Sequence, residues 1–396
     1  MPAPSPSVFR GASNPGSQTA LRELNQQRLV DALLASGPLT QAELARQTGL
    51  STATVSNIVK TMSIAGAVET EPTTSSGRRA LLVRLSNNGA VAVGIDFGRR
   101  HLRVVLTTLG YDLVAEEFVE LPIGHRAVDG IDKAAAVLNH LLEQSGVKPT
   151  SVLGIGVGIP GPIDQRTGTV VQGAILPEWV GIHLQDLEER LHFPVVFDND
   201  ANLGALAEVT WGPHSTVENL VFIKIGSGIG AGLVLNGRVF YGSVGVTGEI
   251  GHETVTDHGI VCHCGNRGCL ETVASTSVMI DLLTPRGAKP IGTSDIVRKA
   301  LAGDSATLRV LDDAGVAIGR ALASVANLIN PEVVVVGGPL AGLGDILLQP
   351  IERGLVRHAV PTVGGATALV MSSLGDRAEA LGAAALVLQQ PGVRNS

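Results

Sequence analysis

The three cysteines of the chain lie within one run of eight residues, Cys262-His263-Cys264-Gly265-Asn266-Arg267-Gly268-Cys269. In a reducing compartment, clustered thiols are more often metal ligands than disulfide partners. Three thiolates need a fourth ligand to complete a tetrahedral site, and this spacing favours zinc. His252 is the natural candidate, with His258 and His263 as alternatives. The sequence therefore predicts a structural Zn²⁺ site; a chance trio of structural thiols is the competing interpretation.

Polar side chains suited to a sugar flank this cluster. Glu249 and His252 precede it, Glu271 follows it, and Asn199 and Asp200 come from an earlier part of the chain. Carboxylates and amides match the hydrogen-bonding needs of hydroxyl groups, and a zinc-bound imidazole keeps one ring nitrogen for a ligand. Asp200 also suits a general base in phosphoryl transfer. Any one of these acids is equally compatible with a solvated surface, but together they predict a sugar pocket.

The elements that must position these residues alternate strands and helices. A buried strand over 91–98 is followed by a partner over 102–107, and a strand over 220–225 runs into the glycine-rich loop 226–232 and a partner over 233–235. Between them we predict a helix over 134–142, strands over 152–157 and 194–197, and a helix reaching residue 208. Two halves built alike predict a duplicated α/β fold with a ligand cleft between two lobes.

Composition agrees with this fold class. The chain has 396 residues, of which 44% are hydrophobic and only 3% aromatic, and its mean hydropathy is +0.29. The length suits two or three domains, and an aliphatic core suits layered α/β architecture. No stretch reaches the ~20 apolar residues that cross a bilayer, and the start Met1-Pro2-Ala3-Pro4 has no signal-peptide character. We expect a cytoplasmic protein without membrane contact, with residues 1–18 as a disordered tail.

Residues 19–86 have the pattern of a winged helix-turn-helix. A first helix over 21–35 ends at Gly37-Pro38. Thr40 begins a second helix with Glu43 as its capping-box partner, and Gly49 permits the next turn. Two strands, 68–70 and 80–83, form the hairpin called the wing. The side chains expected to face inward are Ala42, Leu44, Ala45, Val55, Ile58, Val59 and Met62.

The third helix begins at Ser51 and is predicted to enter the major groove of DNA. Its short hydrogen-bonding side chains suit base edges and phosphates, while two arginines at the hairpin tip suit the minor groove or phosphates. The predicted DNA contacts are Ser51, Thr52, Thr54, Ser56, Asn57, Arg78 and Arg79. A winged-helix module that binds protein is the alternative.

Charge favours the DNA-binding interpretation. The net charge is −7, from 29 basic and 36 acidic residues. Residues 1–90 hold 8 Lys and Arg against 5 Asp and Glu, which leaves 21 basic and 31 acidic residues in the rest. A mildly basic head on an acidic body fits a small DNA-reading module joined to a larger sensor.

From Leu21 to Gln389 the sequence resembles the ROK family, which groups bacterial repressors and sugar kinases. The motif that carries the resemblance is Glu249-Ile250-Gly251-His252 followed by Cys262 through Glu271. The resemblance implies an actin-like, ribonuclease-H-type ATPase fold over 90–390, with a zinc loop over 252–271, in a dimer or tetramer. It implies zinc ligands at His252, Cys262, Cys264 and Cys269. It implies sugar contacts at Asn199, Asp200, Glu249, His252 and Glu271, with Asp200 as the base in kinases.

Departures from the kinase pattern indicate the repressor branch. Family kinases begin near the strand over 91–98 and carry Asp-x-Gly-x-Thr, whereas here Arg100 replaces the threonine. Ile175 stands where kinases tend to have an asparagine before Leu-Pro-x-Trp. Asp200 is retained, so residual kinase activity is the minority alternative. The remnants of the nucleotide loops are Asp96, Gly98, Gly226, Ser227, Gly228, Gly337 and Gly338.

The sequence thus predicts a sugar-responsive repressor of carbohydrate uptake or catabolism genes, not an enzyme. It is expected to bind an inverted-repeat operator as a homo-oligomer, one head per half-site, and to take a monosaccharide or amino sugar in the interlobe cleft. Two other hypotheses stay open: a kinase with a DNA-binding head, and a regulator that responds to a protein partner. The sequence does not choose among xylose, glucose and N-acetylglucosamine as effectors.

Overall fold

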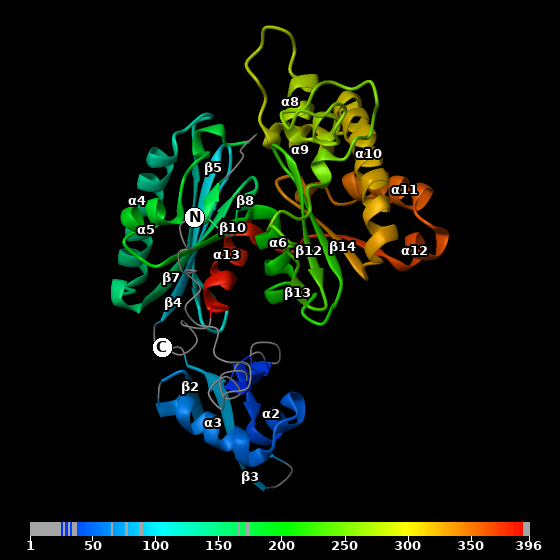
Figure 1. Cartoon of the computed structure of the whole chain (residues 1–396). Coiled ribbons are helices and arrows are strands. Elements are labelled where there is room, and N and C mark those ends of the chain that lie inside the picture. The colour runs from blue at the N-terminus through cyan, green and yellow to red at the C-terminus, as the bar shows by residue number, and fades with distance from the viewer. Residues whose placement is uncertain are drawn as a thin grey trace, which may run out of the picture. The chain divides into compact units, whose positions relative to one another are not determined.

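The computed structural model describes residues 25–26, 28–30, 32–33, 38–64, 66–75, 78–86, 90–164, 167–170 and 175–390. They form two compact units: the first comprises the described residues up to 86 with 109–111 and 390, and the second the described residues of 90–108 and 112–389 (Figure 1). The tail predicted over 1–18 lies outside the described residues. Among the residues described, no helix is long and apolar enough to cross a membrane.

The N-terminal unit combines helices with a three-stranded sheet. It contains β1 (Leu39–Thr40), α2 (Gln41–Thr48), α3 (Thr52–Ile64), β2 (Val68–Ser75) and β3 (Arg78–Leu85). The sheet order is β1-β3-β2, and both pairings are antiparallel. Thr40 and Glu43 form the predicted capping box, and Gly49 ends α2 in the left-handed conformation at φ 70°. The described part of the first predicted helix, between residues 25 and 33, is helical.

The core of this unit confirms the predicted face of α3. Val55, Ile58, Val59 and Met62 are buried and pack with side chains from the other elements. On α2, Leu44 and Ala45 are buried but Ala42 is exposed, so its predicted inward orientation is wrong. The two wing strands are longer than predicted, because their pairing with each other continues beyond their apolar runs, from Val68 with Leu85 to Ser75 with Arg78.

The first lobe of the second unit is built on a five-stranded sheet of order β10-β7-β4-β5-β6. Its strands are β4 (Val91–Phe97), β5 (His101–Thr108), β6 (Leu113–Glu120), β7 (Val152–Ile159) and β10 (Val195–Asn199). Helices α4 (Ala127–Ser145) and α5 (Leu184–Leu191) pack together beside it, and the short strands β8 (Ile163–Asp164) and β9 (Thr169–Val170) form a separate pair. A core of apolar side chains from β4, β5, β7 and α4 fills this lobe.

The second lobe repeats the same strand order. From the corresponding edge of its sheet, the order is β15-β14-β11-β12-β13. Its strands are β11 (Leu220–Ile225), β12 (Ile229–Leu235), β13 (Arg238–Val239), β14 (Val333–Gly337) and β15 (Ala368–Met371). Its helices are α7 (Glu271–Ala274), α8 (Thr276–Leu283), α9 (Thr293–Leu301), α10 (Ser305–Ile329), α11 (Asp345–His358) and α12 (Pro361–Ala366). In each sheet the first two pairings along the chain are antiparallel and the next two parallel, so the predicted duplication is confirmed.

Two helices lock the lobes together. Helix α6 (Asp200–Thr210) follows the last strand of the first sheet but packs on β11 and β12 of the second. Helix α13 (Ala378–Leu388) follows the last strand of the second sheet but packs on β4 and β7 of the first (Figure 1). The two helices also pack on each other. Glycines permit this approach: a Cβ added at Gly156 would lie 1.9 Å from the Ala383 carbonyl, and one at Gly382 1.8 Å from the Leu203 carbonyl.

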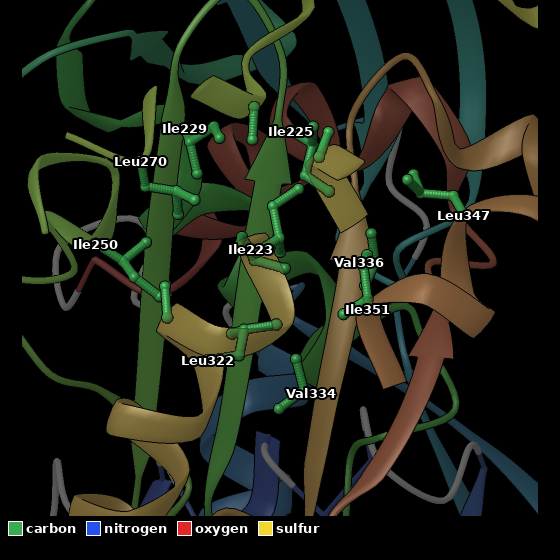
Figure 2. Close-up of a cluster of buried hydrophobic side chains, with 14 of the residues drawn as sticks. Ile223, Ile225, Ile229, Ile250, Leu270, Leu322, Val334, Val336, Leu347 and Ile351 are labelled. Atoms are coloured by element: carbon green, nitrogen blue, oxygen red, sulfur yellow. The ribbon is translucent and has the colours of Figure 1, made fainter. Parts of the chain in front are cut away.

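The core of the second lobe anchors the segments that carry the chemistry. Figure 2 shows Ile250 and Leu270 among the side chains of β11, β12, β14, α10 and α11. Ile250 directly follows Glu249, and Leu270 lies between Cys269 and Glu271. Because Leu270 is fully buried and Ile250 nearly so, burial of apolar surface fixes the backbone on which these polar side chains stand.

Candidate functional site

The predicted zinc ligands converge. One ligand atom each of His252, Cys262, Cys264 and Cys269 lies within 4.8 Å of all the others. The Sγ atoms of Cys264 and Cys269 are 3.7 Å apart, and Cys262 Sγ is 3.6 Å from His252 Nδ1. Bonds of about 2.3 Å to sulfur and about 2.05 Å to nitrogen in a tetrahedron require edges of about 3.8 and 3.6 Å. The donor set and its spacing therefore fit a tetrahedral metal ion of the size of Zn²⁺.

The structure also separates the three candidate histidines. His258 and His263 are exposed and do not belong to the group, whereas His252 lies in a short 3₁₀ turn over Ile250–His252. The loop closes through a backbone bridge between Thr254 and Cys269. At Gly268, φ is 68° and a Cβ would lie 1.7 Å from the Thr256 carbonyl, so the turn into Cys269 requires glycine.

The cluster borders a cleft of about 870 Å³ between the two lobes. Side chains from both sheets line it, as the duplicated architecture predicts. All of the predicted sugar contacts are among its lining residues: Asn199, Asp200, Glu249, His252 and Glu271. Cys264 and His263 also reach the cleft, so the metal cluster forms part of its wall.

The cluster of His252 and the three cysteines lies next to the acids of the cleft. His252 Nε2, the ring nitrogen opposite the one near Cys262, is 3.6 Å from Glu249 Oε2. Cys262 Sγ lies 3.8 Å from Glu271 Oε1. Burial raises the pKa of Glu249, although His252 opposes that shift. A metal ion held by the cluster would therefore fix the orientation of the imidazole beside the Glu249 carboxylate, while Glu271 lies next to the Cys262 ligand.

Asn199 and Asp200 stand where β10 becomes α6. The Asn199 side chain caps α6 by accepting from the Ala201 N–H, and its amide donates to the Gly161 carbonyl at 3.0 Å. The Asp200 side chain is nearly buried; its Oδ1 accepts from the Ala201 N–H at 2.9 Å and its Oδ2 from Lys224 Nζ at 2.8 Å. Both residues thus enter the cleft from a helix N-terminus whose geometry their own side chains help to fix.

The two glycine-rich turns face the same cleft. Gly98, Arg100, Gly226, Ser227, Gly228 and Gly338 line it, whereas Asp96 and Gly337 do not. The second turn is shorter than predicted, because β12 begins at Ile229 and Gly230 and Gly232 pair with β11. At Gly232 a Cβ would lie 2.2 Å from the Ala201 carbonyl, so this glycine serves helix packing and not a loop.

Sequence reasoning missed several cleft residues, among them His101, Lys224 and Glu379. Lys224 Nζ lies 2.8 Å from Asp200 Oδ2 and 3.3 Å from Glu379 Oε1. His101 Nε2 is 2.8 Å from Asp96 Oδ2. A signal for two of them was present, because Lys224 interrupts an otherwise apolar strand just before a glycine turn, and Glu379 interrupts an alanine- and leucine-rich helix.

The exposed face of α3 lies in the other unit. Ser51, Thr52, Ser56 and Asn57 are exposed, and Thr54 is half-buried. Ser51 caps the helix, since its Oγ accepts from the Thr54 N–H at 3.1 Å and lies 2.8 Å from Thr54 Oγ1. The backbones of Arg78 and Arg79 are in β3, paired with Ser75 and Thr74; their side chains are outside the described part.

The fold and the cleft define the class of protein: a winged helix-turn-helix unit joined to a two-lobed, actin-like domain of the sugar-kinase type. Comparison with known proteins gives the family. The model of the ROK family matches residues 92–390, so the chain belongs to the ROK family. The model of the MarR family matches residues 23–79.

Similar proteins fall on both branches of the family. A putative xylose repressor from Caldicellulosiruptor sp. (strain Rt8B.4) is 29% identical over 94% of this chain and 97% of its own length. A crystal structure of a ROK family transcriptional regulator, a homologue of the Escherichia coli MLC protein, has a TM-score of 0.77 at 27% identity over 95% of this chain and 97% of that one. A ROK family glucokinase from Streptomyces griseus, in complex with glucose and AMPPNP, has a TM-score of 0.67 at 25% identity over 75% of this chain and 99% of that one.

Proposed function

We propose that this protein is a sugar-responsive transcriptional repressor of carbohydrate uptake or catabolism genes. The observation that carries the proposal is the joining of two units in one chain: a helix-turn-helix with an exposed polar α3, and a sugar-kinase-type domain whose cleft gathers Asn199, Asp200, Glu249, His252 and Glu271. Similarity to a putative xylose repressor over nearly the full length of both chains supports it. The effector in this proposal is a monosaccharide or an amino sugar.

Zinc is the proposed metal, held by His252, Cys262, Cys264 and Cys269. Three thiolates and one imidazole form a closed tetrahedral set, which leaves no position for a substrate, so the role is structural. The ion's contribution is to hold the loop over 252–271 in shape. Within that loop His252 presents its second ring nitrogen, and Glu249 and Glu271 their carboxylates, to the hydroxyl groups of the sugar.

The proposed domains are a winged helix-turn-helix over 19–86 and the two-lobed domain over 90–390. DNA contacts are assigned to the exposed start of α3 and to the wing, through Ser51, Thr52, Thr54, Ser56, Asn57, Arg78 and Arg79. A cytoplasmic homodimer or homotetramer would place two heads on an inverted repeat. A sugar changes the protein's affinity for DNA only if it binds one lobe arrangement better than the other. A sugar with equal affinity for both arrangements would not shift the equilibrium between them.

A sugar kinase is the second candidate, and the cleft favours it in one respect: Asp200 and the turn Gly226-Ser227-Gly228 line the same cavity. Against it, Arg100 stands in the first phosphate turn where the kinase pattern has threonine. Its guanidinium places a bulky cation in a turn that must let backbone approach phosphate closely. We therefore propose that the protein regulates and does not catalyse.

The test combines two measurements on the purified, zinc-loaded protein. DNA selected from a random pool by the protein itself is labelled, and its release is followed by fluorescence anisotropy across a panel of monosaccharides and amino sugars. Thermal unfolding is recorded with the same panel, with and without ATP, since a ligand at 100 times its Kd stabilises a fold by about 2.7 kcal/mol. We expect one sugar both to stabilise the protein and to change DNA affinity, without ATP.

Asn57→Ala is the matched variant, because Asn57 is exposed on α3. It should lose about 1–3 kcal/mol of DNA affinity and keep the full thermal response to sugar. Formation of a phosphorylated sugar with ATP would establish the kinase instead. DNA binding that no sugar changes would refute the effector assignment and favour a protein partner.

A further inference from the structure

A buried lysine stands among carboxylates on the floor of the cleft. The Lys224 side chain is 12% exposed, and its Nζ lies 2.8 Å from Asp200 Oδ2 and 3.3 Å from Glu379 Oε1. The Asp200 and Glu379 side chains are 11% and 3% exposed. Asp96, 1% exposed, completes the group through its charge. The three acids come from β4, α6 and α13, so the lysine joins elements of both lobes.

Electrostatics show that the ammonium stays charged there. Burial by itself would lower the pKa of Lys224, but Asp200, Glu379 and Asp96 together raise it well above its ordinary value. The attraction of Lys224 likewise lowers the pKa of Asp96, although burial acts in the opposite direction. Buried charges persist in proteins when they are paired, and here one cation is shared by several acids.

Carboxylates that converge in this way form the donor set that Mg²⁺ prefers. Two oxygens of the group, Asp96 Oδ1 and Glu379 Oε1, are buried and have no hydrogen-bond partner among the described residues. Phosphoryl transfer needs a divalent cation and carboxylates to hold it. We infer that Lys224 is a resident cation that fills a carboxylate site otherwise suited to Mg²⁺, and that it keeps this cleft a sugar-binding site in which phosphate is not transferred.

The lysine also occupies the candidate base. Asp200 Oδ2 accepts from Lys224 Nζ and Asp200 Oδ1 from the Ala201 N–H, so both carboxylate oxygens already have donors. Oxygens engaged in this way still have lone pairs to offer a sugar hydroxyl, but they are already held by donors of the protein itself. Lys224 is thus a specificity-determining residue. The absence of phosphate transfer at a sugar-binding cleft rests on the proposed function. The ion pairs of Lys224 do not, because they exist whether or not the protein binds DNA.

The test is Mn²⁺ binding by the zinc-loaded full-length chain, because Mn²⁺ replaces Mg²⁺ at oxygen ligands and its electron paramagnetic resonance signal counts the bound ion. We expect Lys224→Met to bind one Mn²⁺ ion per chain at the cleft, at least about tenfold more tightly than the wild type, because an ammonium no longer repels the ion. Lys224→Arg keeps the charge and should exclude Mn²⁺ as the wild type does. Adding Asp96→Asn to Lys224→Met should abolish the new site.

Two results would overturn the inference. One is a folded Lys224→Met variant that gains no Mn²⁺ affinity; the other is a wild-type protein that already binds Mn²⁺ in a manner lost on Asp96→Asn. If Lys224→Met does not fold, Lys224→Met/Glu379→Gln removes one charge of each sign and leaves Asp96 and Asp200 to hold the ion. That variant must then show the gain. Failure of the sugar or DNA assays leaves this readout unaffected, so the two proposals fail separately.

Discussion

Replacing His252 by alanine tests the ligand set of the metal cluster. The imidazole supplies one of four convergent ligand atoms, and its Nδ1 is 3.6 Å from Cys262 Sγ. Loss of a group that merely orients a ligand costs metal sites 10- to 100-fold in affinity. Removing a ligand outright costs at least the upper figure, so we expect zinc affinity to fall about 100-fold.

The loss of zinc affinity lowers the stability of the folded protein. With free zinc buffered at 100 times the wild-type Kd, binding stabilises the fold by about 2.7 kcal/mol; at a Kd 100-fold higher, it contributes about 0.4 kcal/mol. The His252→Ala variant should therefore be about 2.3 kcal/mol less stable than the wild type in the same buffer. For a unit of about 300 residues, the melting temperature should therefore fall by about 4 °C.

Thermal unfolding in zinc-buffered solution and competition with a chromophoric chelator measure the two quantities. His258→Ala and His263→Ala are the controls, because both side chains are exposed and lie outside the cluster. They should keep the zinc affinity and melting temperature of the wild type. If His252→Ala retained wild-type affinity while one of the controls lost it, the ligand set derived from the geometry would be wrong.

Two further predictions concern the packing and pH response of the two-lobed unit. Gly156→Ala should cost about 3 kcal/mol in urea unfolding, because its Cβ would lie 1.9 Å from the Ala383 carbonyl, whereas Gly365→Ala, with no atom within 4 Å of its Cβ, should cost nothing. Burial raises the pKa of Glu208, whose side chain accepts a hydrogen bond from Ser372. The protonated carboxyl therefore contributes fully to stability at a pH below the pKa of Glu208 in the unfolded chain. That contribution is lost as the pH rises above 4.5. The stability of the wild type should therefore fall relative to Glu208→Gln as pH rises from 4.5 to 7.5, measured by denaturation at a series of pH values; a constant difference would refute it.

Local patterns in the sequence were sufficient to predict the features that are formed by residues close together along the chain. The capping box of Thr40 and Glu43 depends on residues three apart, and the buried face of α3 depends on helical spacing, so both could be predicted. The cysteine cluster spans eight residues, and a turn of that length brings its thiols together almost regardless of the rest of the fold. The repetition of strand, turn and strand likewise indicated two lobes.

Tertiary structure decided what depends on residues far apart in the chain. The choice of His252 over His258 and His263 followed from the turn over Ile250–His252, which the core fixes through Ile250. The assignment of Gly230 and Gly232 to a strand followed from pairing with β11 and from the approach of α6.

The ion pairs of Lys224 exist because α6 and α13 each pack on the sheet of the other lobe, which brings Asp200 and Glu379 to Lys224 on β11. Residues 200, 224 and 379 share no sequence pattern. Sequence by itself thus determined the two kinds of unit and the loop that gathers the three cysteines, because those depend on neighbours along the chain. Only the fold decided which charges meet in the cleft, because Coulomb interactions depend on distance in space and not on separation in sequence.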